Sequence, residues 1–367
     1  MTRTNGLLVA GLVLAGGVGL AWQPWNATAD PLPPTPPTRF ADNGDPVPAP
    51  GKEPPVPRDQ FGQDRAGPAA APVKLPAISG DQAMKYLKEL CDIGPRVSGS
   101  PGMVKQQKLL IDHFEKCGAK VARQDFQATQ KSQARAVAMT NLIASWHPDR
   151  ARRIILCAHY DTRPSAHEEP NRQNWNKPFV SANDGTSGVA LLMELANHLK
   201  DWPTGVGVDV VIFDGEEYIF DMGVPYVREG DTYFLGSRHF ASEYTKNKAK
   251  LPYRYEAAVL LDLFAHDGAR LAIEEYSLEG APDLVDQIWK TAAAVGAKSF
   301  EYERGFRRGA AVLDDHVPLL QAGIPAVDIL DFDYKHWHLL SDTPDKCSGK
   351  QLAEVGSVLF TWIAGLK

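Results

Sequence analysis

Hydrophobic runs of strand length alternate with segments of helical periodicity along residues 78–367. Strand-like runs occupy residues 119–128, 139–146, 152–161, 208–213, 256–264 and 324–330. Helical patterns occupy residues 81–92, 103–118, 187–200 and 281–296, and two segments that begin near Gly236 and Lys350. Short apolar runs between helices are typical of strands buried on both faces. The pattern predicts an α/β fold of three layers, in which helices cover both faces of a central mixed, mostly parallel sheet.

The first 77 residues lack this alternation. Arg3 precedes an apolar run from Leu7 to Ala21, and a polar stretch then ends in the small residues 27–29. A positive start, an apolar middle and a small-residue cleavage site are typical of a secretory signal peptide. The apolar run of 15 residues is shorter than a membrane span, so we expect residues 1–29 to be removed on export. An uncleaved membrane anchor is the alternative.

Residues 30–77 are rich in proline. Between Pro31 and Pro76 lie 14 of the 28 prolines in the chain. A segment of this composition cannot bury enough apolar surface to fold, which predicts a disordered linker. Residues 78–367 are long enough for one packed domain. We therefore expect an exported protein, periplasmic or extracellular, that is tethered to a membrane only if the leader stays uncleaved.

Charge and cysteine content exclude two classes of function. The net charge is −6 and no basic stripe is present, so nucleic acid is not an expected partner. Cys91, Cys117, Cys157 and Cys347 form no C-x-x-C pair, which argues against a metal site built from cysteines. Some of them could form disulfides in an exported protein, and the sequence leaves the pairing open.

Acidic and histidine residues follow the predicted strands. Parallel sheets bind ligands beyond the carboxyl ends of their strands. The residues at these positions are His159, Asp161, Asp184, Glu216, Glu217, Asp262, Asp314, Asp315, His316 and His338. Each of them alone fits a structural role, such as the helix cap that Asp184 would provide. Together they form the set of imidazoles and carboxylates that zinc prefers where thiolates are absent, and they predict a metal site.

The adjacent acids Glu216 and Glu217 support this interpretation. Two neighbouring carboxylates repel each other unless a cation, a proton or solvent relieves them. If Glu217 ligates zinc, Glu216 can face the substrate as a general acid or base whose protonation the same cation tunes.

Several short motifs occur along the chain in this order: AHYDTRP, NDGTSGVALLMELA, FDGEEY, LGSRHF, LLDL, DDHVPLLQAGIPAV and WH. They resemble the motifs of the zinc-dependent M28 aminopeptidase family, and more closely those of its glutaminyl cyclase branch. The resemblance covers nearly all of residues 80–367 and implies the zinc aminopeptidase-like fold.

Resemblance to the aminopeptidases implies two zinc ions. The matching ligand positions are His159, Asp184 as the bridge, Glu217, Asp262 and His338. Glu216 would then activate a water molecule that attacks the peptide bond. All of these residue types are present, so a peptidase that hydrolyses N-terminal residues stays an alternative.

Resemblance to the cyclases implies one zinc ion, on the positions that match Asp184, Glu217 and His338. Glu216, Asp262 and Asp314 would form an acid–base network, and Trp337 would bind the substrate, an N-terminal glutamine that is converted to pyroglutamate with release of ammonia. Three features favour this branch: Asp314 precedes the Asp315–His316 pair, Trp337 precedes His338, and a long loop separates Glu217 from Gly236. The partners are then peptide or protein N-termini, and a monomer is expected.

Some positions depart from the cyclase pattern or have a simpler interpretation. The loop over residues 218–235 lacks the tryptophan that lines the pocket of the animal enzymes, and the aromatic expected four residues before Trp337 falls on Asp333. Trp337 could be an ordinary core residue. Asp314 could be a helix cap. A catalytically inactive, zinc-stabilised binding domain is the third hypothesis.

Overall fold

The computed structural model describes residues 77–202, 204–224, 228–301 and 311–366. The predicted signal or anchor and nearly all of the predicted linker lie outside these residues. The structure therefore describes most of the predicted domain over residues 78–367, and the boundary between this domain and the linker stays a prediction.

A six-stranded sheet with the strand order β1-β2-β4-β3-β7-β10 forms the centre of the domain. Its strands are β1 (Lys120–Ala128), β2 (Val137–Trp146), β3 (Arg152–His159), β4 (Gly207–Phe213), β7 (Arg254–Leu261) and β10 (Ala326–Ile329). β4, β3, β7 and β10 run parallel, whereas β2 pairs antiparallel with both β1 and β4. The predicted mixed, mostly parallel sheet is confirmed.

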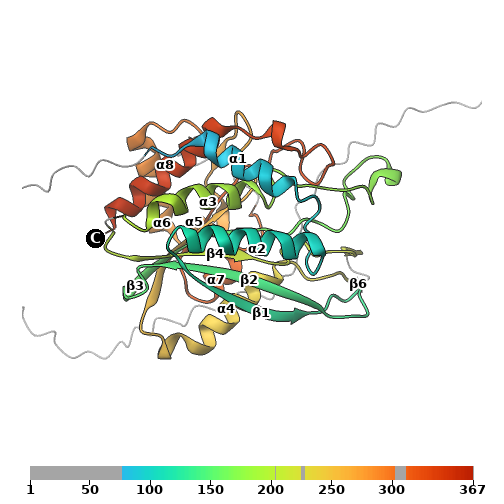
Figure 1. The fold of residues 1–367 in the computed structure, drawn as a ribbon, viewed down its shortest axis with the longest axis horizontal. Helices are drawn as coiled ribbons and strands as arrows, with labels where there is room; N and C mark the ends of the chain where they lie inside the picture. Colours follow the sequence, from blue (N-terminus) through green and yellow to red (C-terminus); the bar gives the residue numbers. More distant parts are fainter. Residues whose placement is uncertain (1–76, 203, 225–227, 302–310, 367) are drawn as a thin grey trace, which may run out of the picture. The chain divides into compact units, whose positions relative to one another are not determined.

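Helices cover both faces of the sheet (Figure 1). The larger hydrophobic core lies between the sheet and α1 (Gly80–Cys91), α2 (Pro101–Lys116), α3 (Ser187–Leu199), α6 (Pro282–Val295) and α8 (Gly349–Gly365). The smaller core lies under α4 (Leu235–Asn247) and α7 (His316–Gln321). β4 is buried at every position, which explains why its sequence shows a continuous apolar run in place of alternation.

Side-chain caps set the starts of three helices. The hydroxyls of Ser79, Ser100 and Ser348 accept hydrogen bonds from backbone N–H groups in the first turns of α1, α2 and α8. Pro101 occupies the first turn of α2, where its missing N–H has no intrahelical partner to lose. These local signals explain why the predicted helices agree with the observed ones to within a few residues.

The shortest elements were not predicted. They are α5 (Glu275–Gly280), α7, the ribbon of β5 (Gly223–Val224) with β6 (Arg228–Glu229), and the pair of β8 (Leu271–Ala272) with β9 (Phe300–Glu301). An element of two to six residues is too short to display a period in its sequence. All four cysteines are free thiols, so none of the disulfides left open by the sequence is formed.

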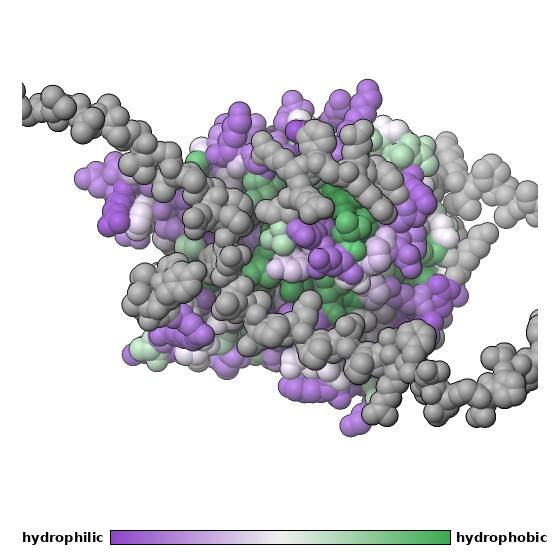
Figure 2. Space-filling view, turned by 180° about the vertical axis from the view of Figure 1, so that it is seen from behind, coloured by the Kyte–Doolittle hydropathy of each residue, from purple (hydrophilic) through white to green (hydrophobic). Residues whose placement is uncertain are grey.

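Few large hydrophobic side chains reach the surface. Among the described residues, the exposed ones are Val104, Phe220, Met222, Val295, Leu313 and Phe332. Figure 2 shows that, on the face turned away in Figure 1, hydrophobic side chains gather near the centre and hydrophilic ones lie around the periphery. Within the described part of the chain, no helix combines the length and the apolar character that a membrane crossing requires.

Candidate active site

The carboxyl ends of the parallel strands bring the predicted ligands together. His159 ends β3, Glu217 follows β4 and Asp262 follows β7, while Asp184 precedes α3 and His338 follows β10. Donor atoms of Asp184, Glu217 and His338 all lie within 4.8 Å of one another. We call these three residues the inner donor set.

The inner donor set is compact and buried. His338 Nε2 lies 2.6 Å from Glu217 Oε1 and 3.4 Å from Asp184 Oδ2. Asp184 and Glu217 are each 2 % exposed and His338 is 5 % exposed. The carboxylates of Asp184 and Glu217 are buried away from solvent, so they need a compensating positive charge to stay ionised.

A second donor group shares Asp184. His159 Nε2 lies 3.1 Å from Asp184 Oδ1 and 3.5 Å from Asp262 Oδ1. The two oxygens of Asp184 therefore face two different histidines, His159 on one side and His338 on the other. This arrangement can accept one cation in the inner donor set, or two cations that Asp184 bridges.

The donor atoms fit a zinc ion. The buried atoms Asp184 Oδ2, Glu217 Oε2, Asp262 Oδ1 and His338 Nδ1 have no hydrogen-bond partner. A buried polar atom without a partner costs about 1–3 kcal/mol, so unpartnered atoms on all three residues of the inner donor set and on Asp262 imply a ligand nearby. Imidazole nitrogen and carboxylate oxygen are ligands that zinc accepts in tetrahedral sites.

Backbone hydrogen bonds hold the acids in place. Asp161 accepts hydrogen bonds from the N–H groups of Glu216, at 3.0 Å, and Glu217, at 3.1 Å. Asp342 accepts from the N–H groups of Asn183 and Asp184. Asp161 and Asp342 thus bind backbone N–H groups, and the side chains of the acids in the site stay free to point inward.

Two backbone conformations at the site are restrictive. Gly185 has a φ of +67°, and a Cβ at this position would lie 2.5 Å from His159 Cε1, so no side chain fits next to the histidine. His338 itself has a φ of 56°, which is uncommon for a residue with a side chain. Strain of this kind is retained where the surroundings demand it, as at ligand-binding positions.

Burial shifts the protonation of the site. Burial raises the pKa of Glu217 well above its usual range, and the neighbouring Asp184 charge adds to the shift. Burial also raises the pKa of Glu216, where the attraction of His159 opposes the shift and Glu217 increases it. For His159, burial would lower the pKa, but hydrogen bonds to Asp161, Asp184 and Asp262 raise it well above the ordinary value. Glu216 is thus suited to accept and return a proton.

Asp314 lies in an acidic network next to the metal donors. Burial and the charge of Asp262 raise the pKa of Asp314 well above its usual range. Its Oδ1 accepts the Asp315 N–H at 2.6 Å, and the residue at the cap position of α7 is Asp315. The helix-cap interpretation of Asp314 is therefore wrong.

The network continues through His316 to two acids, Glu274 and Asp328, that the sequence did not point to. His316 Nε2 lies 3.1 Å from Glu274 Oε2, and His316 Nδ1 lies 3.7 Å from Asp328 Oδ2. His316 belongs to none of the donor groups found among the described residues. Asp328 lies inside β10, a strand that is buried at every position. An acid within an apolar run was the only sign of it in the sequence.

Trp337 is not a core residue. It is half-buried and its indole stacks on the His338 imidazole, with 3.8 Å between ring centroids and 28° between ring planes. Phe332, the neighbour of Asp333, packs on Trp337 with 5.0 Å between ring centroids. Tyr334, on the other side of Asp333, is buried and donates its hydroxyl hydrogen bond to Asp342.

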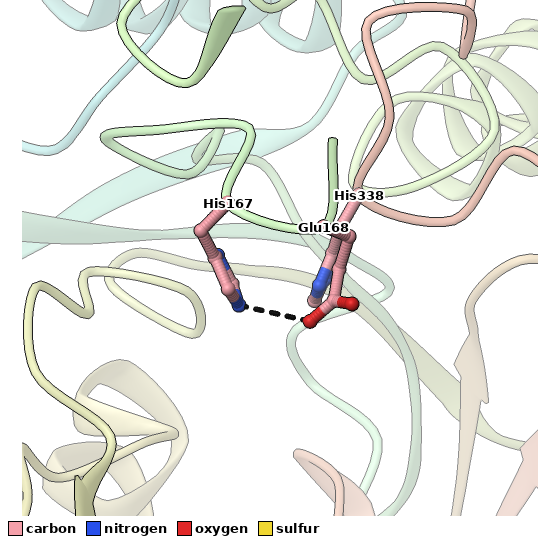
Figure 3. A group of neighbouring side chains, drawn as sticks. All are labelled: His167, Glu168 and His338. Carbon is pink, nitrogen blue, oxygen red and sulfur yellow. Dashed lines mark ion pairs between the residues drawn. The ribbon is translucent and has the colours of Figure 1, made fainter. Parts of the chain in front are cut away.

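Two residues of the segment after β3 were missed by sequence reasoning. Arg163 is buried, and its Nη1 lies 3.5 Å from Glu217 Oε1 and 3.4 Å from His338 Nε2. His167, with Glu168, approaches His338 from the same segment (Figure 3). Arg163 lies in the motif AHYDTRP, but nothing in that motif indicates that it contacts the ligands. A histidine followed by an acid in a loop is an ordinary surface feature in a sequence.

Comparison with known proteins gives a consistent result. The family model for peptidase family M28 matches residues 141–363. The crystal structure of Fimbriiglobus ruber glutaminyl cyclase is 66% identical in sequence, with a TM-score of 0.79 over 82% of this chain and 100% of that chain. The structure of a leucine aminopeptidase precursor from Bacteroides thetaiotaomicron is 31% identical, with a TM-score of 0.71 over 80% of this chain and 99% of that chain. Glutaminyl-peptide cyclotransferase from Bos taurus is 22% identical over an alignment of 300 residues, which covers 73% of this chain and 77% of that protein.

Proposed function

This chain belongs to peptidase family M28, and from that premise we propose that it is a zinc-dependent glutaminyl-peptide cyclotransferase. It would convert the N-terminal glutamine of peptides to pyroglutamate and release ammonia. The observation that carries the proposal is the buried Asp314 carboxyl beside Asp262, because Asp314 belongs to none of the donor groups among the described residues. The similarity to a glutaminyl cyclase supports the same conclusion.

The proposed reaction is an intramolecular aminolysis. The α-amine nitrogen of the terminal glutamine attacks the carbonyl carbon of its own side-chain amide, and a C–N bond forms. The bond from that carbon to the amide nitrogen then breaks, and ammonia leaves. No water molecule is consumed, which is the chemical difference from a peptidase.

Glu216 is the proposed proton carrier. It would take a proton from the attacking amine and return it to the departing nitrogen, so that ammonia leaves as a neutral molecule. The Asp161 carboxylate fixes the Glu216 backbone at 3.0 Å, which holds the acid at the mouth of β4. General acid–base catalysis of this kind contributes roughly 10²–10⁴-fold to a rate.

The inner donor set would hold the zinc ion, which supplies Lewis-acid polarisation of the side-chain amide oxygen. Asp262 and Asp314, whose charges interact inside the protein, would share a proton and accept hydrogen bonds from the tetrahedral intermediate. Trp337 would hold the curled conformer of the glutamine, and correct orientation alone can be worth ~7 kcal/mol or more.

An aminopeptidase is the second candidate. The specific observation in its favour is the second donor group, in which His159 Nε2 lies 3.1 Å from Asp184 Oδ1 and 3.5 Å from Asp262 Oδ1. A cation held there beside the inner donor set would serve hydrolysis. The structural similarity to a leucine aminopeptidase precursor is in line with this alternative.

Mass spectrometry of two peptides distinguishes the candidates. The zinc-loaded protein is incubated with one peptide that begins with Gln and a matched peptide that begins with Leu. Loss of ammonia from the Gln peptide, with the Leu peptide intact, is the expected result. Release of the terminal Leu would establish the peptidase, and an inert protein that still binds zinc would favour a binding domain.

The remaining proposals rest on the sequence. Residues 1–29 favour export to the periplasm or beyond the cell, with residues 30–77 as the linker. The substrate would then be the N-terminus of an exported peptide or protein, and the enzyme is expected to act as a monomer.

A further inference from the structure

His167, Glu168 and His338 form a further group of potential metal ligands, one of four among the described residues. Their donor atoms lie within 4.8 Å of one another, and we call them the outer donor set. His167 Nε2 is 3.1 Å from Glu168 Oε1, and the two rings of His167 and His338 are 5.7 Å apart. Figure 3 shows the His167 imidazole and the Glu168 carboxylate pointing toward each other beside His338.

The two donor sets share His338 but differ in exposure. The side chains of His167 and Glu168 are 20% and 43% exposed, whereas that of His338 is 6% exposed. Solvent therefore reaches one end of the outer donor set, and the inner donor set lies behind it. A hydrated cation reaches a buried site only by exchanging its water molecules for protein ligands, so a site of this depth needs an access route.

The segment that carries His167 and Glu168 is held against the segment that carries His338. The Leu340 N–H donates to Glu169 Oε1 at 2.9 Å, and the Ala166 N–H donates to the Trp175 carbonyl at 2.9 Å. Trp175 Nε1 also donates to the Glu169 carbonyl at 2.9 Å. The outer donor set is thus held in place before any cation arrives, because its two segments are hydrogen-bonded to each other.

Arg163 makes the outer donor set the weaker of the two. Its Nη1 lies 3.4 Å from His338 Nε2, and its Nη2 lies 3.4 Å from His167 Nε2, so its positive charge opposes a cation in both sets. In the inner donor set, two carboxylates offset the positive charge of Arg163. In the outer donor set, only the carboxylate of Glu168 does so. A cation would therefore not stay at the outer donor set, and its residence there would be short.

We propose that His167 and Glu168 are a loading station, which receives a zinc ion from solvent and passes it by ligand exchange around His338 to Asp184 and Glu217. The inference rests on the proposed zinc ion but not on the identity of the reaction. A station on the route speeds arrival and departure equally, because it changes the barrier and not the two end states. It therefore leaves the equilibrium affinity of the inner donor set unchanged.

The test measures zinc exchange rates in the metal-free full chain. Stopped-flow mixing with Zn²⁺ in the presence of a fluorescent zinc chelator gives the association rate, and a chase with excess chelator gives the dissociation rate. In His167→Ala and in Glu168→Gln both rates should fall about tenfold, equivalent to ~1.4 kcal/mol on the barrier. The dissociation constant and the turnover of the loaded enzyme should stay at the wild-type values.

His198→Ala is the matched control. His198 is a partly exposed histidine, with 26% of its side chain accessible, and its Nε2 lies 3.5 Å from Glu194 Oε1 on α3. It belongs to none of the donor groups found in the described part of the chain, so its loss should leave both rates unchanged. Equal melting temperatures of all variants verify that folding is intact.

Two outcomes would overturn the loading station. Wild-type rates in both His167→Ala and Glu168→Gln would mean that zinc takes another route. A weaker equilibrium affinity, or lower turnover of the loaded variants, would make His167 part of the inner site. The proposed function can fail separately. If both variants slow zinc exchange but the wild type does not cyclise a Gln peptide, the loading station is supported and the proposed function is wrong. If the wild type cyclises the peptide but neither variant alters zinc exchange, the proposed function is supported and the loading station is wrong.

Discussion

The indole of Trp337 stacks on the imidazole of His338, with 3.8 Å between the ring centroids. A residue in the inner donor set and the residue proposed to hold the substrate are thus in direct contact. The shape of the substrate pocket and the position of a metal ligand depend on the same pair, which follows from their adjacency in the chain and from the unusual backbone conformation of His338.

Trp337→Ala should lower kcat/KM for a Gln peptide by about 10–100-fold, or ~1.4–2.7 kcal/mol, because the ring that orients the glutamine is removed. Trp337→Phe keeps an aromatic ring in contact with Phe332 and should retain most of the activity. Steady-state kinetics of both variants give the answer. An alanine variant with wild-type kcat/KM would show that Trp337 does not contact the substrate.

Glu216→Gln should abolish turnover and leave the zinc content unchanged, because in the proposed mechanism this side chain carries a proton and is not a zinc ligand, although it lies in a donor group with His159 and Glu217. The loss expected for a general acid–base is roughly 10²–10⁴-fold. Elemental analysis together with a kinetic assay measures both quantities. Glu217→Gln is the comparison, since it should lose zinc as well as activity. Loss of zinc from Glu216→Gln would reverse the two roles.

Asp314→Asn should reduce turnover severely while zinc stays bound, because the amide cannot share a proton with Asp262. Kinetics and zinc content of the variant are measured side by side. Asp345→Asn, which alters an exposed acid paired with Lys346, should behave as the wild type. Unchanged turnover in Asp314→Asn would argue against the cyclase network and favour the aminopeptidase.

Asp214 should make the stability of the fold depend on pH. Burial, together with the charge of Asp161, raises the pKa of Asp214 to about 7, although Ser98 and the Thr140 N–H donate hydrogen bonds to it. The folded state therefore binds this proton more tightly than the unfolded state. Its contribution is fully present below the unfolded pKa of about 4 and is lost as the pH rises to about 7.

Asp214→Asn should remove this dependence. Relative to the wild type, the variant should gain up to ~3 kcal/mol in free energy of unfolding between pH 5 and pH 8, at 1.36 kcal/mol per pKa unit. Urea denaturation of both proteins at the two pH values measures the difference. A constant offset between the two proteins would mean that Asp214 does not titrate in this range.

Removal of the metal should lower the melting temperature. A ligand that binds only the folded state stabilises it by about 2.7 kcal/mol at a concentration of 100 times Kd. Calorimetry with and without a chelator measures the shift. Glu217→Gln should melt at a temperature that the chelator does not alter. Equal melting temperatures of the wild type in both conditions would contradict a zinc ion in the inner donor set.

Much of the fold could be predicted because its signals are local. The continuous apolar run of β4 and the serine caps of α1, α2 and α8 are visible in a few consecutive residues. The short α5 and α7 have no such signal, since six residues complete fewer than two helical turns. The meeting of His159, Asp184, Glu217, Asp262 and His338 could also be anticipated, because residues that follow parallel strands meet at one edge of the sheet, whereas the choice of the inner donor set among them came from the family resemblance.

The sequence by itself determined the order of strands and helices and the residues that follow them, because a buried strand or a capped helix is encoded by neighbouring positions. Only the tertiary structure decided that Asp184 divides its two oxygens between His159 and His338, and that Arg163 lies against His338, 175 positions further along the chain. The reason is physical. Such contacts depend on how loops from separate strands pack over the sheet edge, and no local pattern of hydrophobic and polar residues specifies that packing.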